Sequence, residues 1–180
     1  MDRLLDISQR AITFWRDAGA KAWFEKSDEF DAKMAGLFAD DLAFLETQNL
    51  PQIFADSTAA NDILGLIICL DQFRRNLNRG SGKAFAFDHQ ALKLSQHMVN
   101  NELHLQIDEA IRVFSYMPYM HSENIAVQQQ ALVLFDNNEF AVTHYDLIKA
   151  YGRFPHRNEV LGRTSTPEEL EFLATDGFKG

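Results

Sequence analysis

The sequence is short of cysteine, of basic residues and of long apolar runs. Its single cysteine, Cys69, excludes an intrachain disulfide. The longest apolar run, from Ile63 to Leu70, cannot cross a bilayer, because a spanning helix needs about 20 residues. The N-terminal segment also lacks the apolar core of a secretory signal peptide. We therefore expect a soluble, cytoplasmic protein that has no membrane partner.

Basic residues are outnumbered by acidic ones. The chain has 17 Lys and Arg against 26 Asp and Glu, which gives a formal net charge of −9. Nucleic-acid phosphates and anionic lipid surfaces attract basic protein faces. This balance argues against generic nucleic-acid binding and against docking on anionic membranes, and it suits a soluble protein.

Apolar residues recur with a helical period along most of the chain, and almost no stretch alternates like a strand. No linker or low-complexity segment divides the 180 residues, which is a usual size for one domain. We predict an all-α fold, a compact array of about seven to nine helices in antiparallel pairs, in a single domain over 1–180. The expected helices cover about 4–18, 28–50, 58–73, 84–100, 106–117, 122–135, 139–151 and 166–175.

Several residues predict where helices begin and end. Gly19 and Gly152 suit the left-handed position that commonly follows a helix. Thr166 and Glu169 match the sequence of a capping box, with Pro167 at the first helical position. The last helix is therefore expected to begin directly after Thr166.

Other local signals concern the caps and the core. Asp28 and Ser122 are candidate N-caps, and Glu123 would then be an acid in the first turn of its helix. The run over 63–70 is apolar nearly all round, which is typical of a central, buried helix. Cys69 belongs to this run, so we expect a buried, inert thiol there.

Polar residues concentrate in three segments, at 70–80, 114–124 and 151–169, without the spacing of a solvated helix face. Arginine forks suit carboxylate and phosphate groups, because their fixed donors can bind two oxygens at once. The arginines of the first and third segments could attract an anion, or they could pair with the chain's own carboxylates and tie helix ends together. These arginines, six of the ten in the chain, are Arg74, Arg75, Arg79, Arg153, Arg157 and Arg163.

Histidines gather near the same segments, at His121, His144 and His156. An imidazole can move protons near neutral pH or bind a metal, but no pair has metal-ligand spacing, and we expect no metal site. The chain also has no phosphate-binding loop, no dinucleotide-binding glycine motif and no serine-hydrolase elbow, and we expect no cofactor.

The three segments resemble the motifs of a known family. These are L-D-Q-F-R-R-N-L-N-R-G with the following A-F-A-F-D-H-Q-A-L, then F-S-Y-M-P-Y-M-H-S-E-N, and G-R-F-P-H-R-N-E-V-L-G-R-T-S-T-P-E-E. In this order they resemble the largely bacterial family catalogued as domain of unknown function 924. Members usually read D-Q-F-P-R-N, whereas Arg74 stands at the proline position here.

The resemblance implies an all-α fold of the tetratricopeptide-like superfamily, with superhelical stacking of helix pairs. A weak echo at a period of forty residues, between 90–94 and 130–134, would fit such pairs. The family carries no established activity, so no catalytic residue can be transferred.

Three functions remain open. In the first, a binding module, stacked helices leave a groove for an anionic small molecule or an acidic peptide. In the second, an enzyme, a hydrolase or transferase acts on a small anionic substrate with acid–base groups drawn from His121, Glu123, His144 and Asp71. In the third, the motifs form a buried polar network that locks helix junctions. The candidate ligand-binding residues are Arg74, Arg75, Asn76, Arg79, Tyr116, His121, Arg153, His156, Arg157, Asn158 and Arg163. The sequence does not indicate an oligomeric state.

Overall fold

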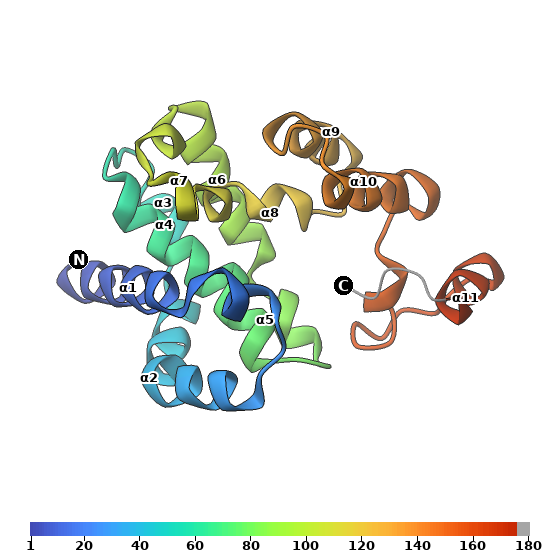
Figure 1. Cartoon of the computed structure of the whole chain (residues 1–180), viewed down its shortest axis with the longest axis horizontal. Coiled ribbons are helices and arrows are strands. Elements are labelled where there is room, and N and C mark those ends of the chain that lie inside the picture. Colours follow the sequence, from blue (N-terminus) through green and yellow to red (C-terminus); the bar gives the residue numbers. More distant parts are fainter. Residues whose placement is uncertain (176–180) are drawn as a thin grey trace. The chain divides into compact units, whose positions relative to one another are not determined.

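The structure, a computed structural model, describes residues 1–175 (Figure 1). The described residues form helices and turns and contain no strand, so the predicted all-α fold is confirmed. They hold eleven α-helices, of which four are single turns. None of these helices has the length and apolar character needed to span a bilayer.

The chain folds into two compact units, which we describe separately. Unit 1 comprises Met1–Arg79 and Lys83–Pro118, and unit 2 comprises Gly80–Gly82 and the chain from Tyr119 onward. The single domain predicted over 1–180 stays a prediction, and its last residues, 176–180, lie outside the described part of the chain.

Unit 1 is built from two long helices and a set of shorter ones around a central segment. Its α-helices are α1 (Asp2–Phe24), α2 (Asp28–Glu46), α3 (Leu50–Ile53), α4 (Ala60–Ile68), α5 (Arg74–Leu77), α6 (Asp88–Asn100) and α7 (Glu109–Arg112). A π-helical segment, η1 (Cys69–Phe73), joins α4 to α5. The 3-10 segments are η2 (Gly82–Phe85), η3 (Leu103–Gln106) and η4 (Val113–Ser115), and η2 and α8 (Met117–Met120) carry the chain between the units.

Helix α1 crosses α4 at close range because both helices have small residues at the crossing (Figure 1). Gly65 of α4 faces Ser8 of α1, and a Cβ placed on Gly65 would overlap the backbone carbonyl of Ser8. The hydroxyl of Ser8 donates to the carbonyl oxygen of Asp62 at 2.7 Å. The predicted helix stop at Gly19 is a kink within α1, where Gly19 has a φ of 74°.

The segment from α4 through η1 forms the centre of unit 1. Every residue from Ile63 to Phe73 is buried, which confirms the prediction of a central helix. Cys69 is fully buried, and burial raises the pKa of its thiol, so the expected inert thiol fits its surroundings. The sequence predicted neither the π-helical turn at Cys69–Phe73 nor the helical turn of α5 after it, where we expected a loop.

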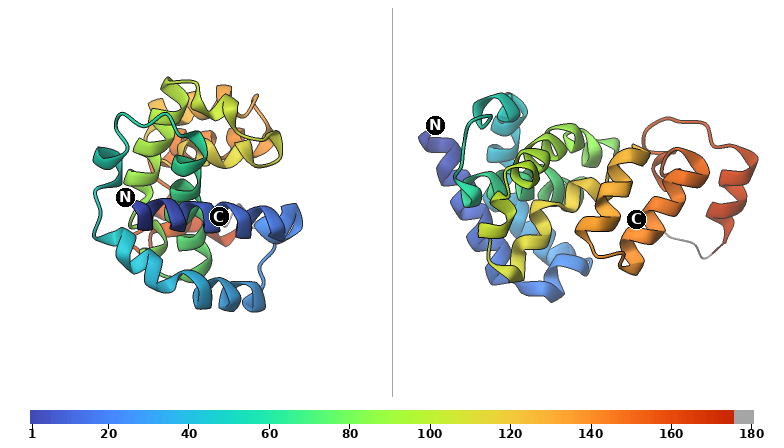
Figure 2. Two further views of the ribbon diagram at one scale, coloured as in Figure 1. Left: turned by 90° about the vertical axis from the view of Figure 1, so that its left-hand side faces the viewer. Right: turned by 90° about the horizontal axis from the view of Figure 1, so that it is seen from above.

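Unit 2 contains α9 (Ile125–Leu134), α10 (Glu139–Tyr151), the 3-10 turn η5 (Pro155–Arg157) and α11 (Pro167–Ala174). In the views of Figure 2, α9 and α10 lie side by side. Leu147 and Ile148 of α10 pack with Phe154, and Tyr151 and Phe172 cover this small core. Gly152 ends α10 with a φ of 70°, as predicted.

The structure tests three of the predicted helix N-caps, and one of the three is confirmed as predicted. The capping box of Thr166 and Glu169 is present at the start of α11. Helix α2 is capped by Ser27, one residue before the predicted Asp28. The predicted cap at Ser122 is wrong, because the side chain of Asn124 accepts the first free amides of α9. The tetratricopeptide-like stacking of helix pairs stays a prediction.

Candidate functional site

The predicted site residues fall into both units. Unit 1 holds Asp71, Arg74, Arg75, Asn76, Arg79 and Tyr116, and unit 2 holds His121, Glu123, His144, Arg153, His156, Arg157, Asn158 and Arg163. We call the polar residues of η1 and α5 with their carboxylate partners the motif-helix cluster. We call His144, His156 and Arg157, which contact the ring of Phe154, together with His121 beside His144, the histidine cluster.

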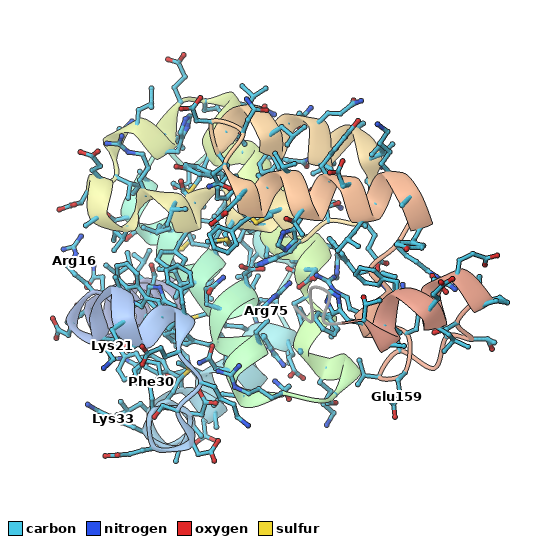
Figure 3. The ribbon with its side chains drawn as sticks, turned by 45° about the vertical axis from the view of Figure 1, so that its right-hand side comes forward. Arg16, Lys21, Phe30, Lys33, Arg75 and Glu159 are labelled. Carbon is cyan, nitrogen blue, oxygen red and sulfur yellow. The ribbon has the colours of Figure 1, made fainter. Side chains whose placement is uncertain are left out.

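In the motif-helix cluster, Arg75, which is labelled in Figure 3, is held by two carboxylates. Its Nη1 lies 3.0 Å from Oδ1 of Asp71, and both Nη atoms donate to Asp88 at 2.9 Å. Asp71 is 1% exposed and also accepts a hydrogen bond from the amide of Gln72 at 2.6 Å. Burial alone would lower the pKa of Arg75, but Asp71 and Asp88 raise it. Arg75 therefore stays charged and fixed.

Two other polar residues of α5, and Arg79 after its end, are paired with carboxylates of α2. Arg74 donates to Glu46 at 2.5 Å and to the carbonyl oxygen of Leu42 at 3.0 Å. Asn76 and Arg79 donate to the two carboxylate oxygens of Asp31, each at 2.8 Å. These contacts tie the end of the central segment to α2, as expected for arginines that join helix ends.

Arg74 stands at the position where family members usually have proline. Its φ is −60°, a value that the proline ring also imposes. This φ is therefore compatible with either residue, and the arginine adds contacts to α2 that a proline could not make.

In unit 2, Glu123 and Arg163 form a bidentate ion pair, with distances of 2.7 and 3.0 Å. Glu123 also accepts the backbone N–H of Phe154 at 2.8 Å, and Arg163 donates to the carbonyl oxygen of Phe154. Burial raises the pKa of Glu123, but Arg163 and the Phe154 amide outweigh it and lower the pKa. Glu123 therefore helps to fix the backbone at Phe154. The prediction that it lies in the first turn of a helix is wrong, because α9 begins at Ile125.

A second bidentate pair joins Arg153 to Glu169, with distances of 2.6 and 2.8 Å. Glu169 is 1% exposed and also accepts from the amide of Asn158 and from the backbone N–H of Thr166. The hydrogen bonds from Arg153 are the main cause that lowers the pKa of Glu169 to about 2. The capping box of α11 is thus part of a network that anchors the loop before it.

The histidine cluster lies around Phe154, a fully buried ring. The guanidinium of Arg157 lies over this ring at 4.4 Å, and its Nη1 donates to the carbonyl oxygen of His121 at 3.2 Å. The rings of His144 and His156 lie 5.5 and 5.6 Å from that of Phe154, and His121 lies 6.4 Å from His144. Three imidazoles and one guanidinium therefore share a small region of unit 2.

The buried member of this cluster is His144, which is 8% exposed. Burial is the main cause that lowers its pKa to about 4, and the positive charges of His121, Arg157 and His156 lower it further. The carbonyl oxygen of Phe140, 2.7 Å from Nδ1, acts in the opposite direction. His144 is therefore neutral at pH 7.

The remaining candidate residues have ordinary surroundings. Tyr116 packs edge-on against His104, with ring centroids 6.2 Å apart, and burial raises its pKa. Asn158 donates to Ser165 and Glu169. Among residues 1–175, no group of three or more His, Cys, Asp or Glu side chains is placed to hold a metal ion.

Sequence reasoning missed the carboxylates and the ring on which the two clusters are built. Asp31 and Glu46 lie in the polar face of a long helix, and nothing in their spacing distinguishes them from solvated acids. Asp88 lies in the quoted motif A-F-A-F-D-H-Q, which was a usable signal. Phe154 lies in the quoted motif G-R-F-P-H-R-N, but no local pattern distinguishes it from the other phenylalanines of the chain.

The described residues define a class of protein: an all-helical one whose motif arginines are mostly fixed by its own carboxylates. The chain belongs to the family described as bacterial proteins of unknown function (DUF924), whose model matches residues 11–177. It is similar to a solved structure, the protein of unknown function ATU0120 from Agrobacterium tumefaciens. The two sequences are 33% identical, and the match covers 93% of this chain and 97% of the other. The two structures superpose with a TM-score of 0.84. No curated protein matches the chain.

Proposed function

We propose that the protein is a binding module for an anionic ligand, a small anion or an acidic peptide, and that the histidine cluster of unit 2 contacts this ligand. The observation that carries the proposal is the position of His144, His156 and Arg157 against the ring of Phe154, with His121 beside His144. Imidazole and guanidinium donors suit carboxylate and phosphate oxygens.

The carboxylate pairs of three other motif arginines argue against those arginines as ligand-binding residues. Arg75, Arg153 and Arg163 each hold a carboxylate in bidentate geometry. Exchanging such a carboxylate for a ligand would break a pair that is already formed, so these arginines serve better as supports. Arg157 contacts the His121 carbonyl oxygen and the face of Phe154, so Arg157 belongs to the histidine cluster.

The electrostatics of unit 2 also favour an anion. Burial is the main cause that lowers the pKa of His144, and the nearby His121, Arg157 and His156 lower it further, as groups that carry positive charge would. Glu123, the nearby carboxylate, is engaged by Arg163. An anion placed among the imidazoles would raise their pKa values and would be stabilised by the protons that they take up.

The enzyme alternative has less support from the same geometry. A general acid must hold a proton near neutral pH, whereas the pKa of Glu123 is lowered by its ion pair. His144 is neutral and buried, with Nδ1 directed at the Phe140 carbonyl oxygen. Asp71, a third candidate, is held by Arg75 and Gln72, and the fourth, His121, is assigned to the anion site.

The test is a thermal-shift and calorimetric titration of the full chain with inorganic phosphate, succinate and a phosphoserine peptide at matched ionic strength. A ligand at 100 times its Kd stabilises the folded state by about 2.7 kcal/mol, which raises the melting temperature by several degrees. The substitutions His156→Gln and Arg157→Lys should weaken binding at least tenfold.

The control variant is His89→Gln, which removes an exposed imidazole of unit 1. It should bind as tightly as the wild type. No shift with any of the three probes, or an equal loss in His89→Gln and His156→Gln, would contradict the proposal.

A further inference from the structure

The side-chain amide of Gln128 holds the turn that carries His121. Helix α9 buries Gln128 and Ala131, and Gln128 is fully buried. Its Nε2 donates to the carbonyl oxygen of Met120 and to that of Ser122, each at 2.7 Å. These two oxygens flank His121 in the chain. Both protons of one amide therefore fix the backbone on either side of this histidine.

The carbonyl oxygen of His121 is held by a second side chain. It accepts a hydrogen bond from Nη1 of Arg157 at 3.2 Å. Three consecutive carbonyl oxygens, at 120, 121 and 122, thus accept from side chains of two separate segments of unit 2. Within the turn, the Ser122 N–H donates to the carbonyl oxygen of Tyr119 at 3.3 Å, a long hydrogen bond. The shape of the turn therefore depends on the side chains that hold its carbonyl oxygens.

Burial of the Gln128 amide has a cost that a purely structural role does not explain. Its Oε1 is buried and accepts no hydrogen bond from the part of the chain that the structure describes. A buried acceptor that lacks a donor destabilises the folded state, and a leucine at this position would avoid that loss. Proteins retain such unfavourable polar groups mostly at functional sites. The two donated hydrogen bonds are what distinguishes Gln128 from a leucine.

We propose that Gln128 is a positioning residue of the anion site, an inference that rests on the proposed function. Gln128 is buried and acts through His121. By fixing the turn at 120–122, it holds the His121 ring beside that of His144, with 6.4 Å between the centroids, before a ligand binds. A site that is ordered in advance loses less conformational entropy on binding and therefore binds more tightly.

The test replaces Gln128 by methionine, which is also unbranched but cannot donate to the two carbonyl oxygens. The full chain is titrated by calorimetry with inorganic phosphate, succinate and the phosphoserine peptide. Gln128→Met should bind each probe that the wild type binds at least tenfold more weakly. Its melting temperature should change little, because the substitution also removes the buried Oε1. The matched control is Gln130→Met, at an exposed glutamine of the same helix, and it should bind like the wild type.

A second measurement follows the turn without any ligand. Proton–carbon NMR of the histidine rings should show the His121 resonances shifted in Gln128→Met and unchanged in Gln130→Met. The resonances of His89 in unit 1 should stay in place in both variants. Gln128→Leu, which also lacks the donors, is measured in parallel, so the result does not depend on how well one variant folds.

The outcomes separate this inference from the proposed function. A wild type and a Gln128→Met variant that bind the same probe equally well would overturn the inference and leave the proposed function intact. A wild type that binds none of the three probes would contradict the proposed function, and this inference with it. A large fall in melting temperature in both Gln128 variants, with the affinity of the folded protein unchanged, would make Gln128 a structural residue only.

Discussion

At the scale of single residues, His144 makes stability depend on pH. Its pKa is about 4 in the folded chain, against an ordinary value of 6.5. Between these values the unfolded chain binds more protons than the folded one, so stability is full above pH 6.5 and is lost as the pH falls toward 4. The loss from this group is at most about 3 kcal/mol.

The measurement is urea unfolding of the wild type and of His144→Gln at several pH values between 4 and 7. The variant should lose less stability than the wild type across this window, because glutamine does not titrate. Parallel pH profiles for the two proteins would show that His144 does not titrate differently on folding.

Glu169 is the second residue for which we predict a clear effect on stability. It accepts hydrogen bonds from Arg153, Asn158 and the Thr166 amide, so Glu169→Gln turns one acceptor into a donor that faces donors. The loss of stability should exceed the loss from Thr166→Ala, which removes one cap and costs about 1 kcal/mol. Thermal unfolding compares the two variants, with the exposed Glu171→Gln as a control that should change little.

At the scale of helices, the close crossing of α1 and α4 depends on Gly65. An alanine Cβ there would lie 2.7 Å from the carbonyl carbon of Ser8, so one helix must move. Overpacking of this kind costs about 1–3 kcal/mol, and backbone overlap places Gly65→Ala at the upper end. Chemical denaturation measures the change in the free energy of unfolding.

Gly36→Ala is the matched control for this substitution. Gly36 lies within α2, and a Cβ there would meet no atom within 4 Å. Alanine is the better helix former, so this variant should be more stable by about 0.5–1 kcal/mol. If Gly65→Ala and Gly36→Ala changed the free energy of unfolding alike, α1 and α4 would not be in close contact at Gly65.

The helices also show what sequence can predict. Amphipathic period and buried runs predict elements such as α1 and the central segment well, because they depend on neighbours along the chain. Glu169 was predicted as a cap for the same reason. The ion pair of Glu123 with Arg163 spans forty residues, and only tertiary folding brings these groups together. Such a pairing leaves no local pattern, so Glu123 was assigned to a helix start.

At the scale of the whole molecule, the natural fluorophores offer a test of domain organisation. Trp15 and Trp23 both lie in unit 1, where Trp23 Nε1 donates to the carbonyl oxygen of Trp15 at 2.6 Å. Tryptophan fluorescence therefore follows unit 1, while circular dichroism follows the helices of both units. If the chain is one cooperative domain, as its sequence predicts, the two unfolding curves should coincide.

The comparison needs no substitution, because unit 2 contains no tryptophan. Separate midpoints would mean that the two units unfold independently and that the single-domain prediction is wrong. The same curves, recorded with and without phosphate, would report whether an anion stabilises the units together.

The π-helical turn at Cys69–Phe73 has a consequence for how this family can vary in length. A π-turn contains one residue more than an α-turn, so it behaves as an insertion that the helix has absorbed. Deleting one residue from a regular α-helix rotates everything after it by about 100°, whereas deleting one residue here would restore an α-helix and keep the following residues in register. Arg75 would still face Asp88, so a gap of one residue should be tolerated at this turn better than elsewhere in the central segment.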